Sequence, residues 1–275
     1  MADPENELRG NRFLVPTEFE GLFTHFYGIH NRSDEPFTKS LLPTFQTIIL
    51  FCFGENAFLT THGNVKVEVE KCVVFGPIKQ AFEYTLPANG AILVANFKND
   101  AFYRFFGRAL IDQDLPTNPD ELLNENCFTA LWHQLDKMNS TTERIDYILH
   151  FCKPYLRSQT WTSSLLSNFK EEKLDPIKAI AAQTNQTTRN VQLKQKEQFG
   201  YSLKERNRFH RFLNAIHRID QQLSKSKKVE WFDIIQACNY YDQSQLIHDF
   251  QHFMHLSPKQ YLQFQEGICN PLSKC

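Results

Sequence analysis

The stretch that decides the fold is Ile234–Phe250, which reads IIQACNYYDQSQLIHDF, followed by Leu256–Tyr261, which reads LSPKQY. Apolar residues recur at helical spacing before Asn239 and again after Asp242. Asn tolerates the positive φ that a tight turn needs, and Asp is a favoured helix N-cap. The stretch therefore predicts two short helices joined by a tight turn, a helix-turn-helix unit. A second turn at Leu256–Tyr261 then opens a last helix.

A weaker version of the same unit lies earlier in the chain. Asp175-Pro176 provides an N-cap with proline at the first helical position, and Asn185 marks the turn. Thr187 caps a second helix over 188–199 that ends at Gly200. Between the two units, apolar residues predict one long amphipathic helix: Phe209, Phe212, Leu213, Ile216, Ile219 and Leu223. A helix of about 20 residues spans roughly 30 Å, close to the roughly 34 Å between successive major-groove faces of B-DNA.

The N-terminal half has the pattern of a β-rich domain. Short β-branched and aromatic runs, separated by Gly and Pro, predict strands over 44–53, 65–70, 73–75, 82–86 and 90–97. Strands at this spacing are typical of a small sandwich or barrel. From about residue 118 the apolar period becomes helical. There Ser140 and Glu143 predict a capping box for a helix that Pro154 should bend or end.

These patterns give an α+β chain of several parts. We expect a β-barrel or β-sandwich sensor over 1–117, helices that pair protomers into a homodimer over 118–160, and a linker over 161–174. An all-α domain with two helix-turn-helix motifs joined by a long helix should occupy 175–265. A tail, 266–275, follows.

Composition and charge narrow the class of protein. Of 275 residues, 41% are hydrophobic and 22% are charged, which is ordinary for a soluble globular protein. No run of 18 apolar residues and no signal-peptide pattern occurs, so we expect a cytoplasmic protein without membrane contact. The seven cysteines lack a C-x-x-C pair, which favours free thiols, either buried or redox-sensing. Residues 170–266 carry 15 Lys+Arg against 11 Asp+Glu, a net +4 that suits a polyanion.

The sequence offers no pattern for catalysis or for a metal. No G-x-S-x-G, P-loop or G-x-G-x-x-G occurs. His248, His252 and His255 share one helix face, but no carboxylate or cysteine accompanies them in a metal-binding arrangement. We therefore expect no catalytic residue, no metal site and no cofactor. Four phenylalanines of the β-rich half are candidates for an apolar ligand pocket: Phe51, Phe53, Phe75 and Phe82.

Residues 175–265 resemble the C-terminal domain of the AraC/XylS family of bacterial transcription regulators. The resemblance rests on Ile180-Ala181-Ala182, Thr187-x-Arg189-x-Val191, Phe199-Gly200-x-Ser202, Arg211-Phe212-x-x-Ala215, Asp233-Ile234, Ala237-Cys238, Asp242-Gln243-Ser244, Phe250, Ser257-Pro258 and Tyr261. It implies seven helices, with two helix-turn-helix motifs that occupy successive major grooves.

The N-terminal half is similar, more faintly, to the effector domain of some Bacteroidetes-type members of that family. The matching residues are Leu42-Pro43, the strand that ends at Phe53, Gly76-Pro77 and Phe105-Phe106-Gly107. This likeness implies a small-molecule-binding β-barrel followed by helices that dimerise.

The sequence departs from the AraC/XylS pattern at several positions. Asn185 and Asn239 replace turn glycines, and Gln186 and Gln195 replace apolar residues of the first unit. In the second unit, Ile235 replaces a small residue. His248 replaces a basic residue of its second helix. These changes predict weaker packing of the first unit and, because fewer counterions are released, a shallower salt dependence of DNA binding.

Our interpretation is a sequence-specific DNA-binding transcription regulator, an activator that contacts RNA polymerase and responds to a small-molecule effector or a partner. The residues expected at double-stranded DNA are Arg189, Asn190, Leu193, Lys194, Lys204, Arg211, Gln243, Ser244, Ile247 and His248. One alternative is a ligand-binding or protein-interaction module whose DNA-binding domain has decayed. Another is an enzyme in the barrel with a DNA-binding appendix.

Overall fold

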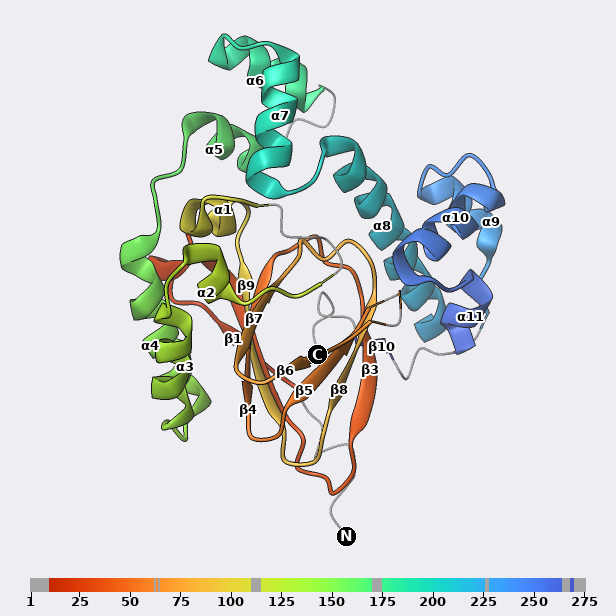
Figure 1. Ribbon diagram of the computed structural model, residues 1–275. Coiled ribbons are helices and arrows are strands. Elements are labelled where there is room, and N and C mark those ends of the chain that lie inside the picture. The colour runs from red at the N-terminus through yellow and green to blue at the C-terminus, as the bar shows by residue number, and fades with distance from the viewer. Residues whose placement is uncertain are drawn as a thin grey trace.

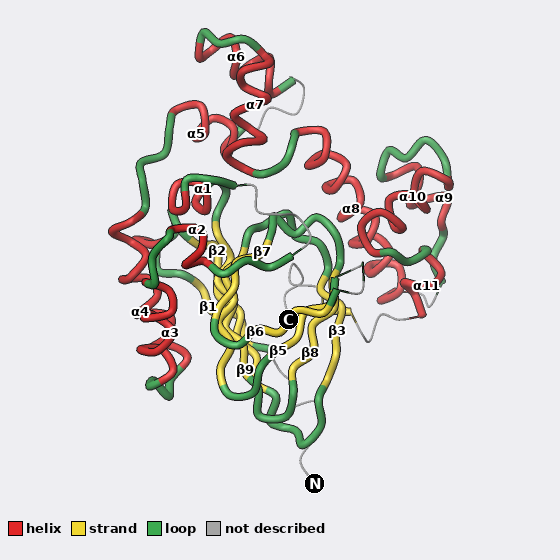
Figure 2. The backbone as a smooth tube through the Cα atoms, in the orientation of Figure 1, coloured by secondary structure: helices red, strands yellow, loops and turns green. Residues whose placement is uncertain are grey.

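A β-sandwich with helices around it forms the molecule, as Figures 1 and 2 show. The structure is a computed structural model that describes residues 10–61, 63, 65–109, 115–169, 175–225, 228–263 and 268–269. Helices α1–α4 lie on one side of the sandwich, α5–α7 lie above it, and α8–α11 extend along the opposite side (Figure 1). The predicted α+β class is confirmed.

The strands form two five-stranded sheets. The first has the order β1 (Asn11–Leu14), β2 (Phe23–His30), β9 (Ala91–Phe97), β4 (Ile48–Phe53) and β7 (Cys72–Phe75). The second has the order β10 (Ile268–Cys269), β3 (Phe37–Leu41), β8 (Phe82–Leu86), β5 (Ala57–Thr60) and β6 (Lys66–Val69). All paired strands are antiparallel except β10 and β3, which are parallel. Of the two architectures expected, the structure has the sandwich.

The central strand β4 separates two hydrophobic cores. All six of its residues are buried. Ile48, Leu50 and Cys52 pack between the sheets, whereas Phe51 and Phe53 pack on the other face of the first sheet. This follows from the period of two along a strand, which sends alternate side chains to opposite faces. Each face therefore needs its own cover.

Helices supply the cover for the outer face of the first sheet. These are α1 (Ala101–Phe106), α2 (Pro119–Leu123), α3 (Cys127–Asp136) and α4 (Thr141–Cys152), with the 3₁₀ turn η3 (Lys153–Tyr155). The Ser140 side chain accepts a hydrogen bond from the Glu143 backbone N–H, and Pro154 lies in η3, just after α4. The N-cap half of the predicted capping box and the predicted helix end are confirmed. Because these helices bury their apolar faces on the sandwich, pairing of protomers through them stays a prediction.

Seven helices are described between residues 161 and 263. They are α5 (Trp161–Asn168), α6 (Pro176–Thr184), α7 (Thr188–Phe199), α8 (Leu203–Lys225), α9 (Trp231–Ala237), α10 (Gln243–Met254) and α11 (Pro258–Gln263). Helix α5 lies within the stretch expected to be a linker. Its Leu166 shares a core with Ile177 and Val191, so α5 completes the first helix-turn-helix unit. Residues 170–174 and most of the expected tail lie outside the described residues.

The predicted turns and caps of both units are confirmed. Asn185 and Asn239 have φ values of 51° and 57°, in the left-handed region. Asp175, Thr187 and Asp242 each accept a hydrogen bond from a backbone N–H at the start of α6, α7 and α10. Gly200 ends α7 with φ 77°. With 23 residues, α8 spans roughly 34 Å between the units.

The second unit shares its core with the sandwich. Leu42, Phe45 and Ala81 belong to the same cluster as the apolar faces of α8 and α10. The Phe45 ring stacks on that of Phe209 with centroids 4.3 Å apart. The Ala81 backbone N–H donates to the Phe253 carbonyl over 2.7 Å. The sandwich therefore helps to build the domain that follows it. None of the helices in the described ranges is long and apolar enough to cross a membrane.

Candidate nucleic-acid interface

The second helices of the two units open onto one cleft. This cleft, of about 1170 Å³, is lined by α7, by the N-terminal half of α8 and by α10. Half of the residues predicted to contact DNA line it: Arg189, Leu193, Lys204, Arg211 and His248. The structure thus brings together side chains of both units that are some 60 residues apart in the sequence.

The cleft is basic although the chain carries a net charge of −1. Two acidic side chains line it, those of Asp175 and Asp249. Five basic side chains line it as well: Arg189, Lys196, Lys204, Arg208 and Arg211. A concave surface with an excess of positive charge raises the local concentration of a polyanion and suits a phosphate backbone.

On α7, the outward face combines charge with one apolar side chain. Arg189 and Asn190 are exposed, and Leu193 is 59% exposed. Lys194 is half-buried and does not line the cleft. The Asn190 side-chain amide donates to Gln186 Oε1 over 3.1 Å, which holds it over the preceding turn. An exposed Leu beside an Arg can contact a thymine methyl while the guanidinium contacts a phosphate or a guanine.

On α10, the predicted residues lie on two flanks. His248 faces the cleft, and Ser244 is exposed. Gln243 and Ile247 line a separate groove of about 340 Å³ against α11, together with Trp231. The four side chains therefore cover an arc of the helix surface, as expected for a helix that enters a groove with its N-terminal half.

Arg211 is held by a neighbour that sequence reasoning missed. Asp249, on the inner face of α10, is 1% exposed. It accepts hydrogen bonds from Arg208 Nε at 2.6 Å, from Arg211 Nη2 at 3.0 Å and from the Tyr240 hydroxyl at 3.0 Å. The Arg211 guanidinium also lies 4.5 Å from the centroid of the Tyr240 ring. The sequence carried a signal, because an aspartate interrupts the apolar face formed by Leu246 and Phe250.

The ion pair between Arg211 and Asp249 stabilises the charged form of both side chains. Burial alone would lower the pKa of Arg211, but its hydrogen bond and attraction to Asp249 raise that pKa above its ordinary value. Burial, followed by the charge of Asp249, raises the pKa of the Tyr240 hydroxyl. Arg211 therefore stays charged and Tyr240 stays a hydrogen-bond donor. Both fix α10 on α8.

The polar residues that depart from the AraC/XylS pattern have different environments. The Gln186 amide donates to Thr162 Oγ1 over 3.0 Å, which links α5 to the turn of the first unit. Gln195 is 1% exposed, and its Nε2 has no hydrogen-bond partner among the described residues. A buried amide donor without a partner destabilises a fold by about 1–3 kcal/mol.

The four candidate pocket phenylalanines do not share one pocket. Phe51 and Phe53 pack under the helices, on the far side of the first sheet. Phe75 and Phe82 pack against each other with ring centroids 4.7 Å apart, between the sheets. The cavity inside the sandwich measures about 50 Å³, which fits a water molecule rather than a drug-sized ligand.

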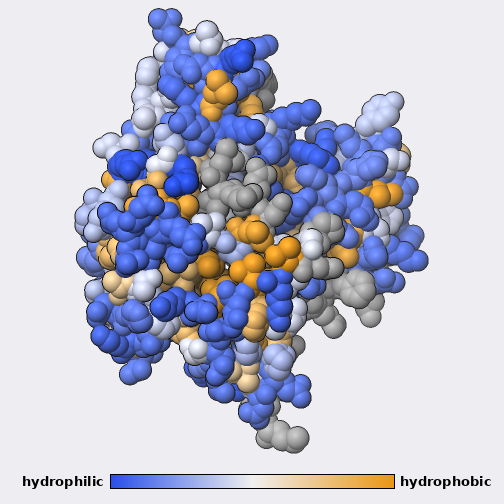
Figure 3. Space-filling view, viewed as in Figure 1, coloured by the Kyte–Doolittle hydropathy of each residue, from blue (hydrophilic) through white to orange (hydrophobic). Residues whose placement is uncertain are grey.

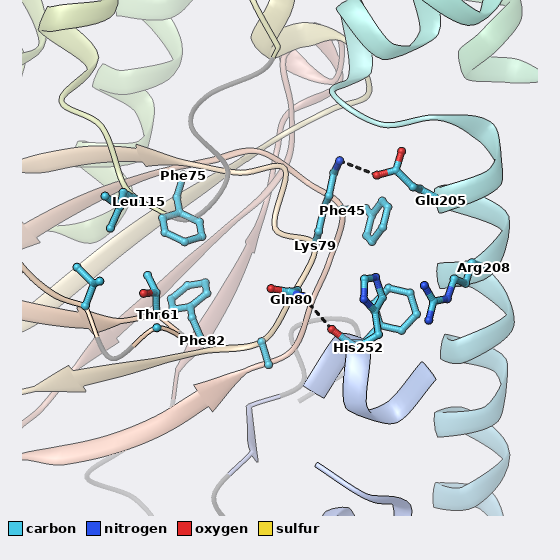
Figure 4. Close-up of a pocket in the computed structure, with 14 residues that line it drawn as sticks. Phe45, Thr61, Phe75, Lys79, Gln80, Phe82, Leu115, Glu205, Arg208 and His252 are labelled. Atoms are coloured by element: carbon cyan, nitrogen blue, oxygen red, sulfur yellow. Dashed lines mark hydrogen bonds and ion pairs between the residues drawn. The ribbon is translucent and has the colours of Figure 1, made fainter. Parts of the chain in front are cut away.

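A larger cavity of about 580 Å³ lies where the sandwich meets α8 and α10 (Figure 4). Phe75 and Phe82 form part of its apolar wall, and Figure 3 shows apolar side chains gathered in the middle of this face. On its polar side, Lys79 Nζ lies 2.8 Å from Glu205 Oε1. The Gln80 amide donates to the His252 carbonyl over 3.1 Å.

Glu205 takes part both in the ion pair with Lys79 and in the N-terminal cap of α8. Its Oε2 accepts hydrogen bonds from the Ser202 backbone N–H and hydroxyl, a capping box at the start of α8. Burial would raise the pKa of this carboxyl, but the hydrogen bonds from Lys79 and Ser202 prevail and lower it to about 2. The S-x-x-E pattern over 202–205 is visible in the sequence, but its partner Lys79 is not. A contact made by the sandwich therefore reaches the first turn of the helix that joins the two units.

The described cysteines are suited to packing. Cys52, Cys72, Cys152 and Cys238 are buried and Cys127 is half-buried, and all five are free thiols. Burial raises the pKa of each, to about 12 for Cys72. These thiols are therefore poor nucleophiles at neutral pH. Across the described part of the chain, no group of three His, Cys, Asp or Glu side chains could hold a metal ion.

Comparisons with known proteins give only distant likenesses. No family model and no curated protein matches the chain. Among solved structures, ToxT from Vibrio cholerae O395 is 12% identical over 96% of this chain and 100% of that chain, with a TM-score of 0.38. Unsaturated fatty acid-bound ToxT from strain SCE256 is 13% identical over 95% and 97%, with a TM-score of 0.38. A cupin protein from Desulfovibrio desulfuricans is 9% identical over 35% and 88%, with a TM-score of 0.26. Likenesses at this level say nothing about the ligands or the function of this chain.

Proposed function

We propose that this chain is a sequence-specific DNA-binding transcription regulator of the AraC/XylS type. The observation that supports this proposal is one basic cleft that Arg189 and Leu193 of α7 and His248 of α10 line together. Two reading helices joined by a rigid spacer can contact neighbouring turns of one duplex.

The residues predicted to contact DNA divide by chemistry. Arg189, Lys194 and Lys204 are assigned to phosphates, and Leu193 and Ile247 to thymine methyl groups. Asn190, Gln243, Ser244 and His248 are assigned to base edges or phosphates. Arg211 is assigned a supporting place, because it is bound to Asp249.

We propose that the domain boundary lies before α5 and not at residue 175. Leu166 of α5 packs in the core of the first unit, so the DNA-binding part begins at Trp161. The sandwich and helices α1–α4 form the sensor. Exposed Tyr147 and Tyr155, at 40% and 57%, are candidates for the face that pairs protomers. Activation would then follow from contact with RNA polymerase.

We assign the effector-binding site to the junction between the sandwich and the helices α8 and α10. The sandwich interior has room for little more than water, whereas the cavity beside Lys79 and Glu205 is large enough for a small molecule. A small-molecule effector or a partner segment bound there would change the contacts that hold α8 on the sandwich. An effector that binds only the folded chain should raise the melting temperature of the full-length protein in a thermal-shift screen.

The test of DNA binding uses full-length protein and duplexes selected by it from a random-sequence library. Replacing both Gln243 and His248 by Ala, or both Arg189 and Leu193 by Ala, should weaken binding to the selected duplex at least tenfold in a gel-shift assay. Replacing Lys66 by Ala, on the exposed edge strand β6, is the control and should have no effect. Unchanged affinity and selectivity in both double variants would contradict the assignment.

A salt titration on selected and random duplexes separates this function from a protein-interaction module with a decayed reading domain. A regulator binds both, prefers the selected duplex and loses affinity as salt rises. A decayed domain binds neither with preference.

A further inference from the structure

We propose that Asp249 limits the sequence-independent part of DNA binding, by withholding Arg208 and Arg211 from DNA phosphates. This inference rests on the proposed DNA-binding function. Asp249 itself makes no contact with DNA. It is a positioning residue that acts through two arginines.

The geometry places the arginines between the two reading helices. Arg208 and Arg211 both extend from α8 and line the cleft, and their side chains are 36% and 25% exposed. They are within reach of a phosphate backbone that spans α7 and α10. Each instead donates to a different oxygen of Asp249, over 2.6 and 3.0 Å.

The pairing is hard to break because the carboxylate is enclosed. Asp249 is 1% exposed, so it has almost no access to water if an arginine turns away. Leaving a buried charge without its partner is strongly unfavourable, so a phosphate in water competes poorly for these guanidiniums. The Tyr240 hydroxyl adds a third hydrogen bond to the same carboxylate and keeps it in place.

The consequence concerns the balance between charge and base reading. With Arg208 and Arg211 withheld, the other basic side chains that line the cleft are Arg189, Lys196 and Lys204. Phosphate contacts bind all sequences alike, whereas base contacts discriminate. Asp249 thus lowers the sequence-independent share of binding, and with it the salt dependence of binding to any duplex.

The test compares wild type with Asp249→Asn, which keeps the shape of the side chain and removes its charge. On random duplex the variant should bind more tightly at low salt. Its log–log salt slope should be steeper by about 1–2, since each added phosphate contact contributes roughly 0.9. Its affinity for the selected duplex should rise by a similar factor, because phosphate contacts act alike on every sequence. Asp233→Asn, an exposed aspartate of α9, makes the same charge change and should leave the slope as in wild type.

A second variant keeps the test decisive. Arg208→Gln alone should leave the wild-type slope unchanged, because that arginine contacts no phosphate. Combined with Asp249→Asn, it should bring the steeper slope back toward that of wild type.

Weaker binding to both duplexes with an unchanged slope in Asp249→Asn would show a purely structural role and overturn the inference. A shallower slope in Arg208→Gln alone would also overturn it, even if Asp249→Asn does not fold. Wild-type protein that binds neither duplex would instead refute the proposed function, and the inference with it.

Discussion

The ion pair between Lys79 and Glu205 should couple the sandwich energetically to α8. A double-mutant cycle with Lys79→Met and Glu205→Gln measures this coupling. Gln is the second residue type that a capping box accepts, so Glu205→Gln keeps the hydrogen bonds with Ser202 and removes only the charge. Lys79→Met keeps the length of the side chain and removes its ammonium.

The expected coupling is about 1 kcal/mol. The two charged atoms are 2.8 Å apart, and the side chains are 15% and 43% exposed. Between the dielectric of bulk water and that near a protein surface, Coulomb attraction at 2.8 Å is about 1.5–6 kcal/mol, and desolvation and side-chain ordering offset much of it. The pKa of about 2 for Glu205, against 4.5 ordinarily, corresponds to about 3 kcal/mol by linkage. Because the carboxylate is partly exposed and part of the shift comes from the Ser202 hydrogen bonds, the share that belongs to Lys79 is about 1 kcal/mol.

The pH dependence follows from the sign of that shift. The folded pKa lies below the unfolded one, so the stabilisation is complete above pH 4.5 and is lost as the pH falls toward 2. Urea unfolding of the four proteins at pH 7 and at pH 3, followed by circular dichroism, gives the coupling at each pH. If the changes in unfolding free energy of the two single variants add up to that of the double variant within about 0.3 kcal/mol at pH 7, there is no coupling and the reasoning is refuted.

Three further predictions concern side chains in the cores. Gln195→Met should raise the free energy of unfolding by about 1 kcal/mol because it removes a buried amide donor without a partner; a lower melting temperature would contradict this. His25 is 3% exposed, and burial, followed by the charge of Arg12, lowers its pKa to about 4. The unfolded chain therefore takes up a proton first, so stability should fall as the pH drops from 6.5 to 4, and His25→Leu should flatten that part of the stability profile. Phe250→Ala should destabilise by about 3–5 kcal/mol in urea unfolding, since Phe250 is fully buried with its ring centroid 5.1 Å from that of Phe212; a loss below about 1 kcal/mol would show that the core collapses around the gap.

Local signals predicted the helical half well. The caps at Asp175, Thr187 and Asp242 and the turns at Asn185 and Asn239 depend on hydrogen bonds and φ values within a few residues, which single positions can indicate. The fold class and the strands near 82–86 and 91–97 followed from period and punctuation in the same way.

Long-range packing was not predictable from these signals. The pocket prediction grouped Phe51 and Phe53 with Phe75 and Phe82, but strand alternation and the unforeseen helical cover divide them between two cores. Helix α5 was expected to be a linker, because its polar composition hides the contact that Leu166 makes with the first unit. The arginines that bind Asp249 lie 41 and 38 residues away, and Glu205 lies 126 residues from Lys79, so no short window of sequence contains both partners.

The sandwich and the second unit share one hydrophobic core, to which the sandwich contributes Leu42, Phe45 and Ala81. This shared core limits how the helical part can be joined to other proteins. A chimaera that joined these helices to a foreign sensor would leave the Phe209 ring without the aromatic face that covers it here. The apolar surface of α8 and α10 that the sandwich covers would then be exposed and would promote aggregation. These helices can be transferred to another protein only if the exposed apolar surface is replaced by polar residues, or if the new sensor domain supplies an aromatic side chain that packs on Phe209.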